Sequence, residues 1–339
     1  DSKGVLYLRL LFNTRDFSEE ELSYLSVLST AFAYMDTDHY RFQDLNSEIY
    51  LHSGGFSTDI TSYPDFQDKN KYTGVFSLCF KFLEGEMQQG LGYLGEILFH
   101  THLSDEKRLS EILLEIKSRE RMRLESTGHS YAVISAMESF SPTSFYHERV
   151  KGIRYYHFIE KLEEDFRKNP KNLGEKLTAL SKKLLEGKNL CVAVGGDLEI
   201  YRKEKVSLSD FLAKHFSEKE EWEESVFAAG EGERKAWITP SQVNYVARVG
   251  SFRDEALPYT GALKVMKNAL TFDFLWKNIR EKGNAYGVMS GFGRSGESYV
   301  VSYRDPHVGR TYEVYKKIAD YLCNFEATEL EMTKYIMGA

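Results

Sequence analysis

The same order of secondary-structure elements is predicted twice along the chain, and this repeat restricts the possible folds more than any other feature of the sequence. The order is a strand, two helices, a glycine-containing corner, two strands and a helix. In the first copy these elements are predicted at residues 5–12, 19–33, 39–51, 53–55, 56–63, 72–82 and 85–99. Ser53-Gly54-Gly55 ends the second helix, because glycine readily adopts the left-handed conformation that terminates helices.

The second copy lies in the last third of the chain. Its elements are predicted at residues 243–249, 257–270, 272–282, 283–286, 286–292, 298–303 and 307–322. Gly283 takes the place of Gly54-Gly55, while Asp305-Pro306 supplies an N-cap and a first-turn proline for the last helix. A structural duplication is the simplest explanation of the shared order.

Between the two copies, helices are predicted at residues 104–124, at 129–140 and up to Glu186, followed by a buried strand at 189–195. Residues 218–233 are acidic and have no apolar period, which is typical of a linker. We therefore predict an α+β protein. A first domain with an associated helical region covers 1–217, a linker covers 218–235, and a second, C-terminally incomplete domain covers 236–339. The start at Asp1 and a helix beginning near Thr328 indicate that both ends are cuts through a longer protein.

Composition excludes several classes of function. The chain has 339 residues and a net charge of -7, and its basic residues are interleaved with Glu, so a nucleic-acid surface is not expected. No apolar run reaches the roughly 18 residues that span a bilayer, so no membrane partner is expected either. The three cysteines, Cys79, Cys191 and Cys323, form no CxxC motif. They predict buried free thiols in a reducing compartment, such as a bacterial cytoplasm or an organelle matrix.

The common catalytic motifs are absent from the sequence. A zinc hydrolase needs two histidines four apart on a helix, and no two of the nine histidines have this spacing. His100 and His102 are interpreted as surface or core histidines. Gly195-Gly196-Asp197 follows a strand, as in a dinucleotide loop, but GxGxxG is missing and residues 199–201 are a poor helix start beside a pyrophosphate. The glycine-rich stretch 291–296 lies between two strands and predicts a hairpin loop.

Arg280 and Tyr286 remain as polar side chains at an otherwise apolar corner, within the stretch REKGNAYG. On spacing alone, the favoured interpretation is an arginine that caps a helix end and a tyrosine in the core or at its rim. The functional alternative is that the turn at Gly283 brings the guanidinium and the phenol to one side. There they could hold a peptide carbonyl or carboxylate and stabilise a developing oxyanion.

Five stretches carry a resemblance to a known family. GALKVMKNALTFDFLWKNIREKGNAYG (261–287) and SYVVSYRDPHV (298–308) resemble the C-terminal half of presequence proteases, which are zinc metallopeptidases of the pitrilysin/insulinase family. GVLYLRLLF, IYLHSGGF and GHSYAVISAMESFSPTSFYHERVKGI in the first domain resemble the third domain of these enzymes and its helical region. The resemblance covers essentially the whole chain, and its most specific element is Arg-x5-Tyr.

The resemblance implies two related LuxS/processing-peptidase-like α/β-sandwich domains, each an antiparallel-rich sheet packed by helices. It also implies that the N-terminal half of the same polypeptide binds the catalytic Zn²⁺ through HxxEH, so that this chain binds no metal. The present half would supply Arg280 and Tyr286 to substrate binding and transition-state stabilisation. Asn284 stands where the family commonly has a second glycine, and because Asn tolerates a left-handed backbone, the Gly283-Asn284 corner should persist.

The functional hypothesis is therefore the C-terminal half of a zinc metalloendopeptidase that degrades unfolded peptides inside a closed chamber. The isolated chain would be inactive. Two alternatives remain open: a non-catalytic subunit that only shapes a chamber, and a peptide-binding module that uses its sheet edge. The sequence determines neither peptide preference, physiological substrate nor oligomeric state.

Overall fold

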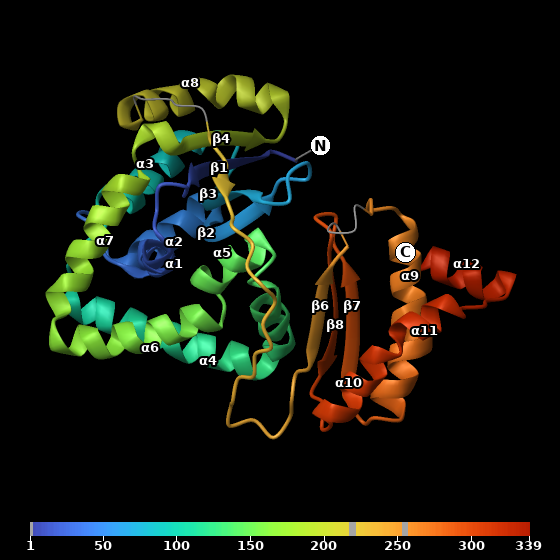
Figure 1. Cartoon of the computed structure of the whole chain (residues 1–339). Helices are drawn as coiled ribbons and strands as arrows, with labels where there is room; N and C mark the ends of the chain where they lie inside the picture. Colours follow the sequence, from blue (N-terminus) through green and yellow to red (C-terminus); the bar gives the residue numbers. More distant parts are fainter. Residues whose placement is uncertain (1–2, 217–221, 253–256) are drawn as a thin grey trace. The chain divides into compact units, whose positions relative to one another are not determined.

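The computed structural model describes residues 3–216, 222–252 and 257–339, which form two compact units (Figure 1). Each unit combines separated stretches of chain. Unit 1 comprises 1–63, 72–120 and 149–225, and unit 2 comprises 64–71, 121–148 and 226–339. These units are defined by contacts within the fold, whereas the domains predicted from the sequence are defined by the repeated order of elements. The predicted domain boundaries therefore stay a prediction.

Four strands form the main path of the sheet in unit 1, in the order β2-β3-β1-β4. They are β1 (Val5–Asn13), β2 (Ser53–Pro64), β3 (Lys71–Leu83) and β4 (Leu190–Gly195). β1 pairs antiparallel with both β3 and β4, so that Leu8 lies opposite Phe80 on one side and Val194 on the other. The predicted strands of the first copy are confirmed.

Strict alternation along β1 builds the core of unit 1. Leu6, Leu8, Leu10 and Phe12 are at most 1% exposed, whereas Tyr7 between them is 43% exposed. Successive side chains of a strand point to opposite faces, so one face is buried and the other is accessible. Each buried large apolar side chain contributes about 1.5–3 kcal/mol, and this contribution fixes the register.

β4 corrects two expectations. It is an edge strand whose residues alternate between half-buried and exposed, so the predicted buried strand at 189–195 is wrong in its burial. Cys191 on this strand and Cys323 are exposed, and Cys79 is half-buried. All three are free thiols, as predicted, but none is buried. Cys191 is exposed because β4 has a neighbouring strand on one side only.

Eight α-helices and a short 3-10 helix are described before residue 217. Those up to residue 150 are α1 (Glu19–Tyr34), α2 (Phe42–His52), α3 (Met87–Phe99), α4 (Glu106–Met137) and α5 (Pro142–Val150). The others are α6 (Ile153–Lys168), α7 (Pro170–Leu184), η1 (Gly187–Asn189) and α8 (Leu198–His215). α2 passes directly into β2 at the extended residue Ser53, so the predicted glycine termination at 54–55 is wrong. Gly55 has a φ of 99° but lies inside β2.

The two helices expected at 104–124 and 129–140 are both present within α4. They meet at a kink, where the backbone of Thr127 is non-helical (φ -124°, ψ 28°). One helix, α8, was not predicted from the sequence. The Asp197 carboxylate accepts the Glu199 amide at 2.8 Å and caps α8, which is a common way to begin a helix.

The sheet of unit 2 repeats the connectivity of unit 1. Its strands are β6 (Ala247–Ser251), β7 (Gly287–Phe292) and β8 (Glu297–Tyr303), in the order β6-β8-β7 with antiparallel pairing. In both units the third strand along the chain is central, with the first strand on one side and the second on the other. The structure therefore has a mixed helix and antiparallel-sheet fold, and the strand order agrees with the predicted duplication. The hairpin loop predicted at 291–296 is confirmed between β7 and β8.

The helices of unit 2 are α9 (Ala262–Asn268), the π-helix η2 (Ala269–Glu281), α10 (Val308–Lys316), α11 (Ile318–Cys323) and α12 (Glu329–Met337). The two helices predicted at 257–270 and 272–282 are instead one continuous run, in which η2 packs along β7 (Figure 1). Thr328 caps α12 through a capping box, as predicted. Asp305 is not the N-cap of α10, because the N-cap is His307, two residues later. The buried Asp305 carboxylate accepts hydrogen bonds from the His307 amide at 2.8 Å and from the Thr311 hydroxyl at 2.6 Å.

A second hydrophobic core fills unit 2. It is built from Val246, Leu270, Leu275, Ile279, Ala285, Val288, Val300 and Tyr315. The Tyr315 hydroxyl donates to the carbonyl of Val246 at 2.9 Å, and burial raises the pKa of this phenol above its usual value. The two ends of the corner, Ile279 and Ala285, both belong to this core, so the corner is anchored from each side.

The predicted linker at 218–235 makes specific contacts at several of its residues; residues 218–221 lie outside the described residues. β5 (Ser225–Val226) pairs with β3, and Phe227 is buried. The Lys235 ammonium lies 2.8 Å from the Glu138 carboxylate. The segment has no apolar period because its contacts are made by single residues and not by one face of a helix or strand.

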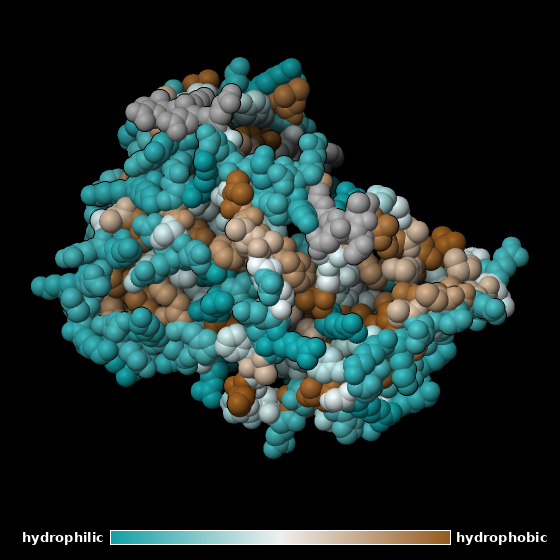
Figure 2. Space-filling view, in the orientation of Figure 1, coloured by the Kyte–Doolittle hydropathy of each residue, from teal (hydrophilic) through white to brown (hydrophobic). Residues whose placement is uncertain are grey.

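Hydrophilic side chains predominate on the face of α6 and α7 seen in Figure 2. Among the described residues, no helix combines the length and apolar character needed to cross a membrane.

Candidate functional site

The corner between η2 and β7 is closed by three backbone hydrogen bonds. The Lys282 amide donates to the Lys277 carbonyl at 3.2 Å, which is a π-type bond across five residues. The Asn284 amide then donates to the Arg280 carbonyl at 2.9 Å, and the Ala285 amide to the Ile279 carbonyl at 3.1 Å. The Asn284 bond has the pattern of a left-handed helix termination. Arg280 therefore lies in the last turn of the helix, as predicted.

The corner needs one residue with a left-handed backbone and one residue without a side chain, and Asn284 and Gly283 meet these two needs. Asn284 has a φ of 61° and supplies the left-handed residue of the corner. Gly283 is required for space instead, since a Cβ atom at this position would lie 2.4 Å from the Ile279 carbonyl oxygen. The chain can thus turn sharply only without a side chain at 283.

The corner brings the Arg280 and Tyr286 side chains together. The guanidinium carbon of Arg280 lies 4.1 Å from the centre of the Trp276 ring and 5.7 Å from the centre of the Tyr286 ring. Tyr286 is 65% exposed. No carboxylate among the described residues forms an ion pair with Arg280, although an arginine that only capped a helix would often have one. Both side chains are available for a ligand on the same side of the corner.

Tyr303, at the end of β8, connects this pair to its surroundings. Its ring centre lies 5.8 Å from that of Tyr286, 5.1 Å from that of His129 and 5.7 Å from that of Tyr245. Its hydroxyl donates to the Ser126 carbonyl at 3.2 Å, beside the kink of α4. The aromatic side chains therefore fix the position of Tyr303 against α4, and Tyr303 in turn supports Tyr286.

Burial affects two titratable side chains of this cluster. Burial lowers the pKa of His129, whose Nδ1 is buried and has no hydrogen-bond partner among the described residues. Burial raises the pKa of Tyr245. Arg280 and Tyr286 can instead donate several hydrogen bonds to an oxygen atom that carries negative charge. The chemistry open to this site is binding and stabilisation of a carbonyl or carboxylate oxygen.

Sequence reasoning from single motifs missed several contributors: Gly128, His129, Tyr245 and Tyr303. Gly128 has no side chain to clash with Tyr245, whose ring would lie 2.3 Å from an added Cβ atom. Three of these residues are in stretches that carried the resemblance, GHSYAV and SYRDP. Those stretches were the available signal, but single-sequence spacing does not indicate that they meet.

The histidines singled out by the sequence lie elsewhere, in unit 1. His100 Nδ1 and His102 Nε2 each lie 2.8 Å from an Asp38 oxygen, and both side chains are about half exposed. These hydrogen bonds lower the pKa of Asp38, with His102 as the larger cause. Within the described parts of the chain, no group of three His, Cys, Asp or Glu side chains could hold a metal ion.

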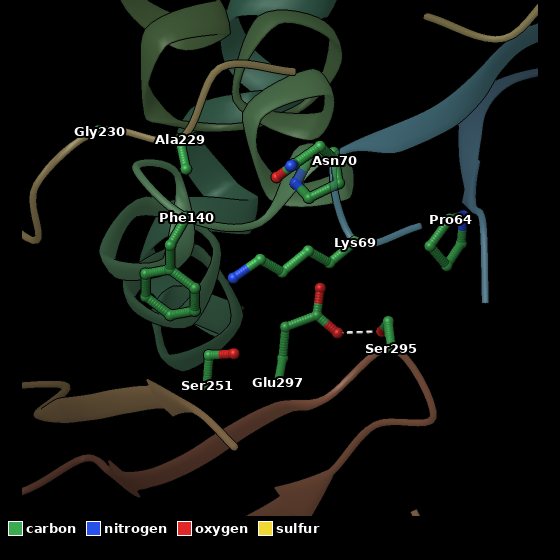
Figure 3. A pocket seen from close by; sticks show the side chains of 10 residues that line it. Pro64, Lys69, Asn70, Phe140, Ala229, Gly230, Ser251, Ser295 and Glu297 are labelled. Carbon is green, nitrogen blue, oxygen red and sulfur yellow. Dashed lines mark hydrogen bonds between the residues drawn. The ribbon is translucent and has the colours of Figure 1, made fainter. Parts of the chain in front are cut away.

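A small cavity of about 140 Å³ lies in unit 2, away from the corner (Figure 3). In the figure the Lys69 side chain extends across it above the Glu297 carboxylate. Glu297 accepts hydrogen bonds from Ser141 at 2.7 Å and from Ser295. Because both carboxylate oxygens have partners, Glu297 fastens the β7–β8 hairpin to the start of α5 and is not a free acid.

Comparison with known proteins adds family information to this geometry. Residues 1–162 match the family model of the region associated with subfamily C of the M16 peptidases, and residues 234–339 match the family model "PreP C-terminal domain". The second match contains Arg280, Tyr286 and Tyr303.

Curated relatives align with nearly the whole chain. Protein HypA of Clostridium perfringens is 30% identical over 98% of this chain and 34% of its own length. Presequence protease 1 of Arabidopsis thaliana is 24% identical over 99% of this chain and 31% of its own, and the mitochondrial presequence protease of Saccharomyces cerevisiae is 25% identical over 98% and 35%. The chain thus spans about a third of the length of the curated relatives it matches.

Solved structures share the fold. A conserved protein from Enterococcus faecalis V583 has a TM-score of 0.67 at 14% identity, covering 98% of this chain and 78% of that one. The periplasmic protease PqqL from Escherichia coli has a TM-score of 0.55 at 13% identity, covering 99% of this chain and 36% of that one. Two matching family models, relatives along nearly the full chain and a shared fold lead to one assignment. The chain belongs to the presequence protease-like M16 peptidases and matches the C-terminal region of such an enzyme.

Proposed function

We propose that this chain is the peptide-binding, non-zinc half of a zinc metalloendopeptidase, and that Arg280 and Tyr286 contact the substrate. The observation that carries the proposal is the position of their side chains. The Arg280 guanidinium and the exposed Tyr286 ring are 5.7 Å apart, with no carboxylate from the described residues paired with the arginine.

The pair is suited to a peptide carbonyl whose oxygen gains negative charge during hydrolysis. A guanidinium and a phenol donate hydrogen bonds to such an oxygen, and donors of this kind stabilise a transition state more than the ground state. Stacking on Trp276 holds the guanidinium in place without neutralising its charge. The charge is therefore available for the substrate.

The metal and its base belong to the other half of the enzyme in this proposal. The family implies a catalytic zinc, but the described residues contain no group that fits one. The contribution of Arg280 and Tyr286 is therefore limited to hydrogen bonding. The partner is the N-terminal half of the same polypeptide, and the two halves enclose unfolded peptides in a chamber. The isolated chain is expected to be inactive.

Kinetics of the full-length enzyme test the assignment. Arg280→Ala and Tyr286→Phe should each lower kcat/KM for an unfolded peptide by about ten- to a thousandfold, the scale of losing one oxyanion-type donor. Tyr50→Phe is a matched control, because Tyr50 is 72% exposed and lies in unit 1. It should leave kcat/KM unchanged.

Wild-type kinetics in both site variants would refute the assigned roles and favour a non-catalytic, chamber-forming part. Micromolar binding of unfolded peptides to the isolated chain, measured by calorimetry, would instead favour a peptide-binding module.

A further inference from the structure

An open cavity of about 540 Å³ in unit 2 lies beside the Tyr303 cluster and is not explained by the Arg280–Tyr286 pair. Its lining includes the side chains of Arg121, Glu125, Ser241, Gln242 and Arg304. Two guanidinium groups face one carboxylate, so the charged groups sum to a positive charge. The hydroxyl and the amide add neutral hydrogen-bonding groups. Such a lining suits an anion that can accept several hydrogen bonds.

Arg304 has an unusual backbone that directs it to this cavity. Its φ is 49°, a left-handed conformation that costs a non-glycine residue about 1–2 kcal/mol. In a continuing strand Arg304 would share the buried face of Ser302, which is 0% exposed. The left-handed turn leaves Arg304 exposed and buries Asp305 instead. Glycine would fit this backbone without strain, so the presence of arginine indicates a use for its side chain.

The surrounding hydrogen bonds hold the strained residue in place. The Arg304 carbonyl accepts the Tyr286 amide at 3.3 Å, and the backbones of Asp305 and Asn244 exchange two hydrogen bonds of 2.9 Å each. Strain that is maintained by its surroundings in this way is found mainly at functional sites. The Arg304 backbone is thus tied directly to Tyr286.

The Arg304 charge has no opposite partner among the described residues. Its guanidinium carbon lies 5.6 Å from the Tyr303 ring centre, and its charge partly offsets the rise in the Tyr245 pKa that burial causes. The Tyr245 hydroxyl donates to the Glu125 carbonyl, at the wall of the cavity. Arg121 pairs with Glu125 at 3.5 Å, but both side chains are about half exposed or more, and such pairs are weak. A carboxylate entering the cavity would meet two guanidinium groups, which bind carboxylates well.

Tyr303 also sets the distance from this cavity to the proposed site. Its ring lies 5.8 Å from the Tyr286 ring and 5.6 Å from the Arg304 guanidinium. A peptide held at Tyr286 would therefore reach Arg304 within about three to four extended residues, each spanning roughly 3.3 Å. We propose that the cavity between Arg121 and Arg304 is a subsite for a carboxylate of the peptide substrate. This inference rests on the proposed peptide-binding role of Arg280 and Tyr286.

The carboxylate could be an Asp or Glu side chain or the free C-terminus, and a set of matched peptides separates these sources. The full-length enzyme is assayed on a fluorogenic peptide that carries Asp or Asn at positions two to four residues from the cleaved bond. A second series ends in either a carboxylate or a carboxamide. The inference predicts that kcat/KM favours the carboxylate member of one series by about tenfold, through KM.

Variants of the cavity test whether Arg304 causes this preference. Arg304→Gln should reduce the ratio of kcat/KM between carboxylate and amide peptides to near one, and Arg304→Lys should retain part of it. Arg304→Asn, which tolerates the left-handed backbone, serves if Arg304→Gln fails to fold. Arg310→Gln is the control, because Arg310 is an exposed arginine elsewhere in unit 2. It should keep the full ratio.

A ratio of one in the wild-type enzyme, or an unchanged ratio in the Arg304 variants, would overturn the subsite. The peptide-binding role of Arg280 and Tyr286 would then still stand if their own variants lose activity. If no peptide of either series is bound or cleaved, the subsite and the proposed function both fail.

Discussion

The backbone amide of Asn284 donates a hydrogen bond of 2.9 Å to the carbonyl of Arg280. The left-handed residue of the corner is therefore bonded directly to the proposed substrate-binding arginine. Tyr286 follows two residues later, and its ring lies 5.7 Å from the Arg280 guanidinium. The backbone conformation of Asn284 thus determines whether the two side chains meet.

Two substitutions of Asn284 should show how much the left-handed backbone at this position affects the free energy of unfolding. Asn284→Ala places a Cβ atom without a compensating polar group at φ 61°, which should cost about 1 kcal/mol of unfolding free energy. Asn284→Gly should be close to neutral, because glycine adopts this conformation freely. Urea unfolding of the two variants measures the difference. Equal stability of the alanine and glycine variants would contradict the strain argument.

Gly128 should resist a substitution that usually stabilises helices. Alanine is favoured over glycine inside helices by about 1 kcal/mol, but a Cβ atom at position 128 would lie 2.3 Å from the Tyr245 ring. Gly128→Ala should therefore destabilise the protein by about 1–3 kcal/mol, the usual cost of overpacking. Gly92→Ala is the matched control, since it lies in α3 and an added Cβ atom there meets nothing within 4 Å. A gain in melting temperature for both variants would show that α4 and Tyr245 are not packed as described.

His129 should make the protein less stable in mild acid. Burial lowers its pKa below the ordinary value near 6.5, so between that value and the lower folded-state pKa the unfolded chain binds more protons than the folded one. Stability is then full above about pH 6.5 and falls as the pH decreases through this window. His129→Phe keeps a ring against Tyr303 and removes the titration.

The measurement is the unfolding free energy of wild type and His129→Phe at about pH 7.5 and about pH 5.5, on either side of the ordinary histidine pKa. The wild-type protein should lose more stability than the variant between these values. His215 also has a pKa lowered mainly by burial, but it titrates in both proteins and cancels in the comparison. An identical pH dependence for the two proteins would show that His129 is not the cause.

The sequence predicted the repeated order of elements because the strands alternate regularly and the corners contain glycine. β1 and β3 have side chains alternating between a buried and an accessible face, and that pattern is local. Burial of whole elements depends on neighbours, so the edge position of β4 and the exposure of Cys191 were not predicted. The cap of α8 was overlooked because Gly195-Gly196 was interpreted only as a loop, although Asp197 is an ordinary N-cap.

The site was predicted less completely than the fold. Arg280 and Tyr286 could be chosen from the motif and its resemblance, but their distance depends on η2, a π-helix whose wider turn the apolar spacing does not distinguish from two α-helices. Tyr303 and His129 are far apart in sequence and meet only in the folded unit. The left-handed backbone of Arg304 likewise depends on the hydrogen bond from the Tyr286 amide to Arg304 and on the bonds between Asn244 and the next residue, Asp305. Long-range packing, which one sequence does not reveal, determines these features.

The most direct test of the central claim is a double-mutant cycle in kcat/KM with Arg280→Ala, Tyr286→Phe and the combined variant of the full-length enzyme. If both side chains hold the same substrate oxygen, each single change removes most of the effect. The combined variant should then be about as active as the weaker single variant. Two single losses that multiply in the combined variant, or no loss in either, would contradict a shared role for Arg280 and Tyr286.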